Sequence, residues 1–261
     1  MHRGRRLRYV RGVPPEYDAS RATYALTRQT DPSIAAAIER ALGDARTVVN
    51  VGAGAGSYES PDREVIAVEP SETMRAQRPA DAAPVIAAYA EDLPLEDDSV
   101  DAALAAMTVH HWDDQRRGLA EMARVARRRV VLFTFDVDHA TDLWLVRDYL
   151  PEIVEIDRAR FLPIDEQAAA IGGETRIERV PIPHDCRDGL LGAFWGRPER
   201  YLDPALLPGN SAFSSLDPSV LARGLGKLRN DLDSGAWRRR YGGLLGREEL
   251  DIGYRLVVAE L

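Results

Sequence analysis

The sequence contains very little cysteine and very little lysine. Cys186 is the one cysteine among 261 residues, which excludes an intrachain disulfide and is compatible with a reducing cytoplasm. Lys227 is the one lysine among 34 lysine and arginine residues, so arginine carries nearly all of the positive charge. A hydrophobic fraction of 45% is enough for a substantial core, and a chain of this length can hold one large α/β domain or two small ones.

The chain also lacks an excess of positive charge and a long apolar run. Its formal net charge of −8 argues against general affinity for nucleic acid, because such binding needs a basic surface. No apolar run approaches the roughly 18 residues of a membrane span. The basic start of the chain, residues 1–11, has no apolar core of the kind found in a secretory signal. We therefore expect a cytoplasmic protein that has neither nucleic acid nor a membrane as a partner, and the sequence leaves its oligomeric state open.

Three glycines at alternate positions are the most informative feature that is present. The β-branched residues 47–51 precede them and fit a buried parallel strand. Gly52, Gly54 and Gly56 follow. Glycine lets the backbone turn sharply and approach a ligand closely, because it has no Cβ to clash.

A carboxylate follows the next apolar run. Residues 65–68 predict a second strand, and Glu69 stands at its end, where a carboxylate can accept two hydrogen bonds from a ribose diol. The dinucleotide pattern G-x-G-x-x-G would need a glycine at the position of Ser57, and no G-x-x-x-x-G-K-[ST] motif is present. The arrangement predicts a nucleoside-cofactor site that is neither a P-loop nor a typical dinucleotide site.

Four short motifs carry a family resemblance. They are VVNVGAGAGSYE at 48–59, VIAVEPSETM at 65–74, AEDLP at 90–94 and TVHHW at 108–112. With these motifs in this order, residues 17–136 resemble the class I S-adenosylmethionine (SAM) methyltransferases, in particular the broad group that acts on small molecules. The resemblance implies an α/β fold with a doubly wound, Rossmann-like sheet of seven strands. It also implies SAM as cofactor and S-adenosylhomocysteine as product.

The resemblance further implies which residues contact the cofactor. The N-terminal segment follows the pattern Y-D-x-x-R-x-x-Y, so Arg21 would pair with the SAM carboxylate and Tyr17 or Tyr24 would line the methyl pocket. The alternative is that these three are surface residues of a helix. Met74 would lie near the ribose and adenine, although a packing role explains this methionine equally well.

The adenine contact departs from the pattern of the family. Many relatives have an aspartate two residues before Glu91, where this chain has Tyr89. The polar partner of the adenine would then be Asp92 or the backbone at 90–91, or Tyr89 would stack on the ring. The complete set of predicted cofactor contacts is Tyr17, Arg21, Tyr24, Gly52, Gly54, Gly56, Glu69, Met74, Glu91 and Asp92.

Two adjacent histidines are the candidates for a general base. Methyl transfer needs a base only when the acceptor is a weakly acidic hydroxyl or a protonated amine. His110 and His111 end the strand predicted at 100–107, and histidine suits proton transfer because its reference pKa is about 6.5. The alternative for each is that it packs against the loop or hydrogen-bonds to it. Trp112 is expected in the core.

Two other polar clusters are read as loop structure. Asp136, Asp138 and His139 could bind Mg²⁺, because hard cations prefer carboxylate oxygens, but acids after a strand are more often turn residues and no metal is predicted. Residues 184–186, His-Asp-Cys, resemble a fragment of a nucleophilic site. Adjacency in sequence is not the geometry of a triad, so a loop at the mouth of the pocket is predicted.

The remaining patterns predict the domain organisation. A helical region is predicted at 17–43. Within it, Asp31 should be the N-cap of the last helix, with Pro32 at its first position, and Gly43 should be the C-cap. A basic arm (1–16) precedes a core (17–183 plus 251–261), and an insertion at 184–250 should cap the substrate side with helices near 187–200 and 217–234. Further helices are predicted at 71–77, 113–127, 140–160 and 164–171, and further strands at 85–89, 129–135, 175–182 and 252–260.

The sequence therefore predicts a SAM-dependent methyltransferase that acts on a small molecule, with the oxygen of a hydroxyl or carboxyl as the first choice of acceptor. The N-P-P-Y loop of DNA amino-methylases is absent, which counts against a nucleobase. One alternative is a protein of the same fold that binds SAM while catalysing a cyclisation or isomerisation. Others are a non-catalytic binding module that uses the basic arm and, disfavoured by the glycine spacing, a nicotinamide oxidoreductase.

Overall fold

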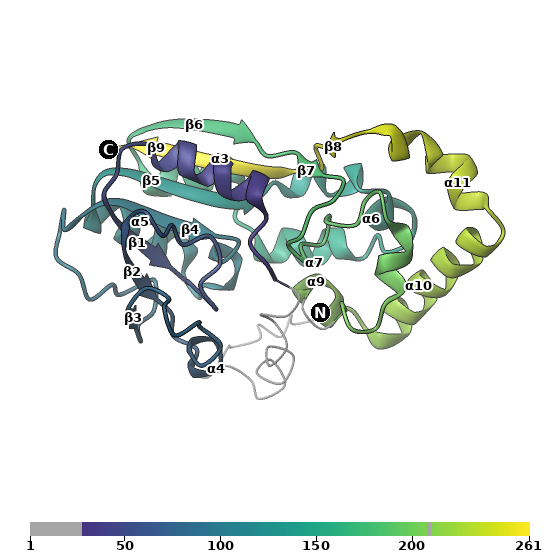
Figure 1. Cartoon of the computed structure of the whole chain (residues 1–261), viewed down its shortest axis with the longest axis horizontal. Coiled ribbons are helices and arrows are strands. Elements are labelled where there is room, and N and C mark those ends of the chain that lie inside the picture. The colour runs from purple at the N-terminus through teal and green to yellow at the C-terminus, as the bar shows by residue number, and fades with distance from the viewer. Residues whose placement is uncertain (1–27, 208–209) are drawn as a thin grey trace, which may run out of the picture.

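A seven-stranded sheet runs through the part of the chain that the computed structural model describes, residues 28–207 and 210–261 (Figure 1). In sheet order the strands are β3 (Val85–Ile86), β2 (Glu64–Val68), β1 (Thr47–Val51), β4 (Val100–Ala106), β5 (Ala126–Phe135), β9 (Tyr254–Glu260) and β6 (Glu174–Arg179). Strand β9 is antiparallel to both of its neighbours, and the other pairs are parallel. This is the doubly wound sheet that the sequence predicted.

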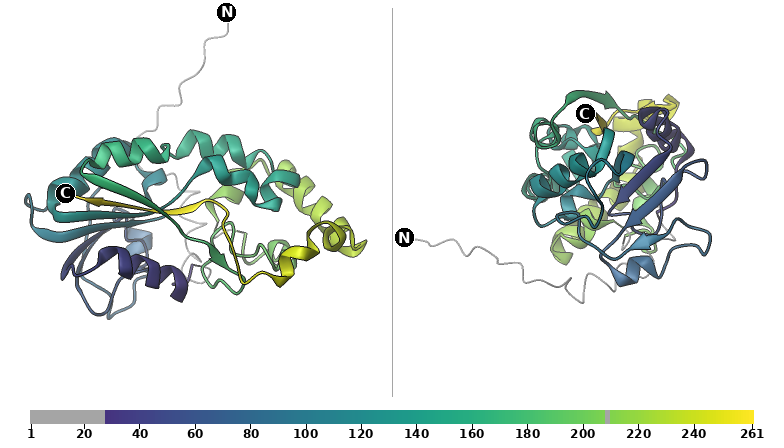
Figure 2. Two further views of the ribbon diagram at one scale, coloured as in Figure 1. Left: turned by 90° about the horizontal axis from the view of Figure 1, so that it is seen from above. Right: turned by 90° about the vertical axis from the view of Figure 1, so that its left-hand side faces the viewer.

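Helices cover both faces of this sheet. The α-helices in the described residues are α3 (Pro32–Leu42), α4 (Glu72–Arg75), α5 (Gln115–Val125), α6 (Trp144–Asp148), α7 (Ile153–Arg160), α8 (Ile164–Ile171), α9 (Ser211–Ser214), α10 (Pro218–Asp233) and α11 (Ala236–Tyr241). The 3₁₀ helices are η1 (Val109–His111), η2 (Val137–Asp142), η3 (Pro198–Leu202) and η4 (Gly242–Gly246). Helix α3 lies on one face, and α5 and α8 lie on the other (Figure 2).

The central strands are apolar on both sides because helices cover both faces of the sheet. In β5, Val131 and Phe133 belong to the core beneath α3, whereas Val130 and Leu132 belong to the core beneath α5 and α8. All four side chains are fully buried. A strand that is covered on both faces reads as a continuous apolar run, which is the pattern that identified it in the sequence.

Helix α3 has the caps that were predicted. The Asp31 carboxylate accepts hydrogen bonds from the backbone N–H groups of Ser33 (2.9 Å) and Ile34 (3.3 Å), and Gly43 ends the helix at a φ of 58°. Residues 28–31, which precede it, are not helical. The basic arm and the rest of the helical region predicted at 17–43 lie outside the described residues.

Two predicted elements are shorter or broken. The helix predicted at 140–160 is divided into η2, α6 and α7, and the break between α6 and α7 contains Pro151, which cannot donate a helical hydrogen bond and disfavours helix in the residue before it. The strand predicted at 85–89 ends at Ile86. Helix α5 is capped by Asp114 rather than by Asp113.

The helix predicted near 187–200 is wrong, whereas the one at 217–234 is confirmed as α10. Residues 187–197 contain no helix and form turns at 191–196, and two glycines in this segment stand where a side chain would clash with its surroundings. A Cβ on Gly192 would lie 2.0 Å from Ile252 Cδ1, and one on Gly196 would lie 2.4 Å from His184 Cδ2. Tertiary contact therefore overrides local helix propensity in this segment.

The insertion, residues 184–250, lies beyond the carboxyl ends of the parallel strands (Figure 1). Its two ends are held together by a small second sheet, in which β7 (Ile182–Pro183) pairs with β8 (Glu249–Leu250). Between these ends the chain forms η3, α9, α10, α11 and η4. The insertion therefore leaves the core and returns to it at one place.

Trp144 of α6 joins the core to the insertion. Its indole N–H donates to the backbone oxygen of Trp195 at 2.8 Å, and its ring packs edge-on against Tyr201 and Trp237, with ring centroids 5.6 and 5.3 Å apart. Trp144 is 1% exposed. Edge-to-face packing of this kind adds to the free energy gained by burying the rings.

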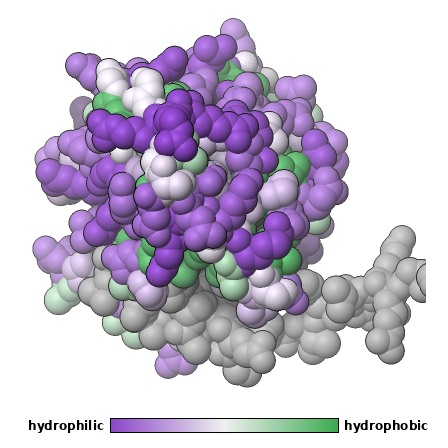
Figure 3. Space-filling view, turned by 90° about the vertical axis from the view of Figure 1, so that its right-hand side faces the viewer, coloured by the Kyte–Doolittle hydropathy of each residue, from purple (hydrophilic) through white to green (hydrophobic). Residues whose placement is uncertain are grey.

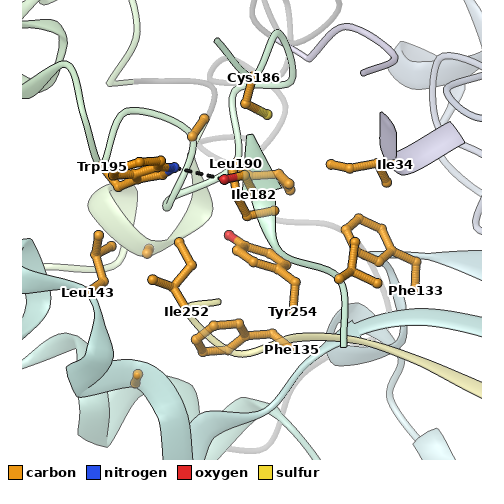
Figure 4. Close-up of a cluster of buried hydrophobic side chains, with 14 of the residues drawn as sticks. Ile34, Phe133, Phe135, Leu143, Ile182, Cys186, Leu190, Trp195, Ile252 and Tyr254 are labelled. Atoms are coloured by element: carbon orange, nitrogen blue, oxygen red, sulfur yellow. Dashed lines mark hydrogen bonds between the residues drawn. The ribbon is translucent and has the colours of Figure 1, made fainter. Parts of the chain in front are cut away.

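This aromatic cluster is continuous with the core of the sheet. Trp195 donates its indole N–H to the backbone oxygen of Ile182 at 2.9 Å, beside Tyr254 and Phe133 (Figure 4). The outer face of the insertion is mostly hydrophilic (Figure 3). In the described part of the chain, no helix combines the length and the apolar character that crossing a membrane would require.

Two glycines of α10 provide a test of this packing. A Cβ on Gly224 would lie 2.3 Å from Leu150 Cδ2 and 2.6 Å from the backbone oxygen of Tyr149, whereas a Cβ on Gly226 would meet nothing within 4 Å. We expect Gly224→Ala to lower the free energy of unfolding by about 1–3 kcal/mol because of the clash. Gly226→Ala should raise it by about 0.5–1 kcal/mol, because alanine favours helix. Urea denaturation measures both, and equal stabilities would contradict the close approach of α10 to residues 149–150.

Candidate functional site

Several loops meet where the parallel strands of the sheet end. The glycine loop (residues 52–58) follows β1, Glu69 follows β2, and η1 with its two histidines follows β4. In an open α/β sheet, ligands bind outside the carboxyl ends of the strands, near the point where the strand order reverses. The insertion lies beyond the same edge (Figure 1).

The glycine loop is tied to the end of β2. The backbone N–H groups of Gly52 and Ala53 both donate to the Val68 oxygen, at 2.8 and 3.0 Å. Gly52 and Gly54 have φ angles of +68° and +53°, a conformation that residues with a side chain rarely adopt. The loop therefore leaves β1 in a path that depends on glycine.

Gly52 also allows the loops after β1 and β4 to touch. A Cβ at this position would lie 2.1 Å from Oγ1 of Thr108, which is closer than any real contact. Thr108 is buried, and its backbone oxygen accepts from the His111 N–H at 2.8 Å. The predicted cofactor loop and the histidine pair are therefore packed against each other through this contact.

Glu69 is the buried charge of the site. It is 6% exposed, its Oε2 accepts from the Gly54 N–H at 2.9 Å, and its Oε1 accepts from the Ser71 N–H at 2.8 Å. Ser71 in turn caps α4 by accepting from the Met74 N–H at 3.3 Å. One carboxylate thus fixes the glycine loop relative to the helix that follows β2.

Met74 lies directly against the glycine loop. Its side chain is buried, and its Cε is 3.1 Å from the point where a Cβ of Gly54 would be. The sequence left a cofactor role and a packing role open for this methionine. The structure brings Met74, Gly54 and Glu69 together.

Glu91 and Asp92 have different environments. The Oε1 of Glu91 accepts from the Asp114 N–H at 3.1 Å, so this carboxylate braces the start of α5. Asp92 is exposed, and its N–H donates to the Tyr89 oxygen at 3.3 Å in a turn. Tyr89 is 58% exposed, which leaves its ring face accessible.

The two histidines lie in an aromatic stack. The His110 ring is 4.0 Å from the ring of His111 and 4.3 Å from that of Phe161, with an interplanar angle of 20° to the latter. Phe161 also meets Phe135 at 5.8 Å, edge to face. His110 is therefore a wall of an aromatic corner at the ends of β4 and β5, and His111 is exposed beside it. Trp112 packs on α5, as expected.

Tyr17, Arg21 and Tyr24 lie outside the described residues, so their roles stay predictions. Asp136 accepts from the Asp138 N–H at 3.2 Å and caps η2, while His139 lies 2.7 Å from Asp142. Within residues 28–207 and 210–261, no group of three or more His, Cys, Asp or Glu side chains is arranged to hold a metal ion. His184 packs edge-on against Trp195.

The sequence analysis missed two charged residues that support the glycine loop. One is Arg78, which donates to Glu59 at 2.8 Å and to the backbone oxygens of Ala83 (3.0 Å) and Gly54 (3.4 Å). The side chains of Arg78 and Glu59 are both almost fully buried. Arg78 belongs to no sequence motif, because its contacts with Gly54 and Glu59 depend on the turn after α4 that brings it next to the loop.

The other is Asp188, in the insertion. Its carboxylate accepts from the Tyr58 hydroxyl at 2.7 Å and forms an ion pair with Arg28, whose second donor lies at 3.2 Å. Asp188 is 1% exposed, and burial together with this carboxylate raises the pKa of the Tyr58 phenol. Tyr58 ends the glycine loop at a φ of 63°. Asp188 therefore joins the insertion, the glycine loop and the segment before α3.

Removal of the Tyr58 hydroxyl tests this junction. Tyr58→Phe would leave a buried carboxylate with one donor fewer, and we expect the free energy of unfolding to fall by about 1–3 kcal/mol. The matched control is Tyr89→Phe, which changes an exposed tyrosine and should leave the stability unaltered. If thermal or urea unfolding shows the two variants to be equally stable, the phenol does not support Asp188.

Comparison with known proteins identifies the family. A family model described as a methyltransferase domain matches residues 49–134. Curated relatives from Mycobacterium tuberculosis and Mycobacterium bovis, named as uncharacterized methyltransferases, are 38% identical over 91 residues. That match covers 32% of this chain and 36% of each relative, so it spans about a third of their length.

Solved structures extend the comparison to about nine-tenths of the chain. The N-methyltransferase 2 of Haemonchus contortus, crystallised with phosphomonomethylethanolamine and S-adenosylhomocysteine, has a TM-score of 0.54 at 14% identity over 92% of this chain and 56% of its own, and shares the fold. A crystal structure from Anabaena variabilis, of a candidate methyltransferase from an antibiotic biosynthesis pathway, is 35% identical with a TM-score of 0.83. It covers 90% of this chain and 99% of its own. The chain therefore belongs to the class I SAM-dependent methyltransferases.

Proposed function

We propose that this protein transfers the methyl group of SAM to an oxygen atom of a small-molecule acceptor. The cofactor assignment rests on the position of Glu69. This buried carboxylate lies at the end of β2 and accepts hydrogen bonds from the Gly54 and Ser71 N–H groups. Each carboxylate oxygen can accept more than one hydrogen bond. Glu69 therefore has acceptor capacity left for the two hydroxyls of a ribose.

The glycine loop and Met74 fit the rest of the cofactor. A Cβ on Gly54 would lie 3.1 Å from Met74 Cε, so glycine at this position keeps the backbone of the loop free of a side chain next to Met74. Met74 would face the ribose and adenine, and the exposed ring of Tyr89 or the Asp92 turn would meet the adenine edge. The buried Arg78–Glu59 pair would hold the loop in place, since Arg78 also donates to the Gly54 oxygen.

Bound SAM would supply an electrophilic methyl group on a sulfonium, and the protein has to align an acceptor with it and exclude water. The corner formed by His110, Phe161 and Phe135 supports this role, since it is aromatic and lies at the ends of β4 and β5. A hydroxyl acceptor needs a nearby group that takes its proton, and His110 and His111 are the candidates from the sequence.

A small acceptor is supported by the insertion and by one relative. The insertion lies over the carboxyl edge of the sheet and is packed against the core through Trp144 and Asp188. It would close the acceptor side and leave room for a small molecule. The Anabaena relative comes from a pathway that makes antibiotics, which are small molecules.

Calorimetric titration with SAM, S-adenosylhomocysteine and NAD tests the cofactor. We expect SAM and S-adenosylhomocysteine to bind with dissociation constants in the micromolar range, because Glu69 and the glycine loop suit one adenosine ribose, and NAD to give no heat. Formation of S-adenosylhomocysteine with an acceptor would then distinguish methyl transfer from a reaction that leaves SAM intact. Binding of NAD alone would refute the proposal.

Substitution of Glu69 tests the ribose contact. Glu69→Ala should weaken SAM binding by roughly 1.5–3 kcal/mol, because it removes a charged hydrogen-bond acceptor. Glu72→Ala, an exposed carboxylate in α4, is the matched control and should bind SAM as the native protein does. Circular dichroism and unfolding curves show whether the variants keep the fold. Unchanged affinity in a folded Glu69→Ala protein would remove the ribose assignment.

A further inference from the structure

One buried carboxylate near the aromatic corner has no hydrogen-bond or ion-pair partner within residues 28–207 and 210–261. Asp157, in α7, is 5% exposed, and its carboxylate forms no hydrogen bond or ion pair with another described residue. Burial raises its pKa to about 6, against the opposing influence of Arg160. A buried carboxylate without a hydrogen-bond partner lowers the free energy of unfolding, and a ligand that bound to it would offset this cost.

The position of Asp157 connects it to the aromatic corner. Its backbone oxygen accepts from the Phe161 N–H at 2.8 Å, and Phe161 stacks on His110. Asp157 follows Ile153 by one helical turn, and Ile153 is fully buried, so Asp157 lies on the inward face of α7. Asp157 therefore lies one helical turn before Phe161, the residue whose ring forms the corner.

The end of α7 is held rigidly by neighbours. Gln115 of α5 donates to the Arg160 oxygen at 2.5 Å and accepts from the Leu162 N–H at 3.1 Å. The Arg160 guanidinium is engaged by Ser215 and by the Ser211 oxygen at 3.4 Å. The Arg160 guanidinium is thus bonded to residues of α9 and its C-cap and forms no ion pair with Asp157, while the backbone that follows Asp157 is held by Gln115.

The cationic groups of α7 and of the elements packed against it are already engaged with other residues. On α7 itself, Glu155 and Arg158 pair with each other at 2.9 Å. The packed element η2 contributes Asp138, His139 and Asp142, of which His139 pairs with Asp142. The packed element α9, SAFS, has no titratable side chain. Asp157 is therefore available to a ligand.

From this placement we infer that Asp157 binds the hydroxyl of the methyl acceptor and takes its proton. The inference rests on the proposed function and names its substrate class, an apolar molecule that carries a hydroxyl group. As the acceptor oxygen forms its bond to the methyl carbon, the carbon–sulfur bond breaks, and its electron pair stays on sulfur. The hydroxyl proton passes to the Asp157 carboxylate. His110 then serves as a wall of the acceptor site.

The first test needs no acceptor and compares the native protein with Asp157→Asn. The folded carboxyl has a pKa of about 6 and the unfolded one about 3.8, so the native protein loses stability as the pH rises through 6. Relative to the variant, its unfolding equilibrium should shift about tenfold toward the unfolded state between pH 5 and pH 8. The variant should be the more stable protein at pH 8. A less stable variant would show that the carboxylate serves the fold, and would overturn the inference.

The second test uses phenol as the probe on protein saturated with S-adenosylhomocysteine. Ligand-observed NMR should detect phenol bound to the native protein, and Asp157→Asn should weaken that binding at least fivefold. Asp165→Asn, an exposed aspartate in α8, is the control and should bind phenol as the native protein does. Absence of phenol binding, or equal binding by Asp157→Asn, would overturn the inference. Failure of S-adenosylhomocysteine to bind would instead count against the proposed function, while the stability comparison would still decide the state of Asp157.

Discussion

The carboxylate of Glu69 is the interaction on which the arrangement of this site depends. The glycine loop has no regular secondary structure, and its backbone, which has four positive φ angles, is not held by helical or sheet hydrogen bonds along its length. Glu69 supplies hydrogen bonds in their place, because one of its oxygens accepts from the Gly54 N–H and the other accepts from the Ser71 N–H. The end of β1, the end of β2 and the start of α4 are thereby joined through a single buried charge.

Two further charges complete the support from outside the loop. Arg78 donates hydrogen bonds to the Gly54 oxygen in the loop and to Glu59 just after it. Asp188 accepts a hydrogen bond from the hydroxyl of Tyr58, the last residue of the loop. These charges are buried but paired, and pairing is the condition under which a charge is tolerated in a protein interior. Asp157 breaks that pattern. Unlike Glu69, Glu59 and Asp188, it has no partner in the described part of the chain, and this difference separates a group that holds the fold from one that would bind a ligand.

The sequence predicted the sheet and the cofactor edge because these depend on local patterns. Strand β5 is apolar on both faces, Asp31 and Gly43 are standard caps, and the glycines of residues 52–56 need no partner to be recognised. The insertion was harder to predict because its structure depends on distant contacts. In the turns at 191–196, Gly192 packs against Ile252 and Gly196 packs against His184, and neither contact can be read from the local sequence. Asp188 and Asp157 escaped notice for the same reason, since neither belongs to a motif and their importance comes from burial.

The pairing of β7 with β8 has a consequence for how this protein can change. Ile182 lies opposite Leu250 and Pro183 lies opposite Glu249, so the chain enters and leaves the insertion through one narrow neck. The covalent connection between the insertion and the seven-stranded sheet is therefore confined to this one place, next to β6 and β9. The contact of Asp188 with Tyr58 is a second connection of another kind, because it is made by side chains alone. A change in the insertion that removed Asp188 would therefore reach the glycine loop directly, although the strands of the sheet would keep their register.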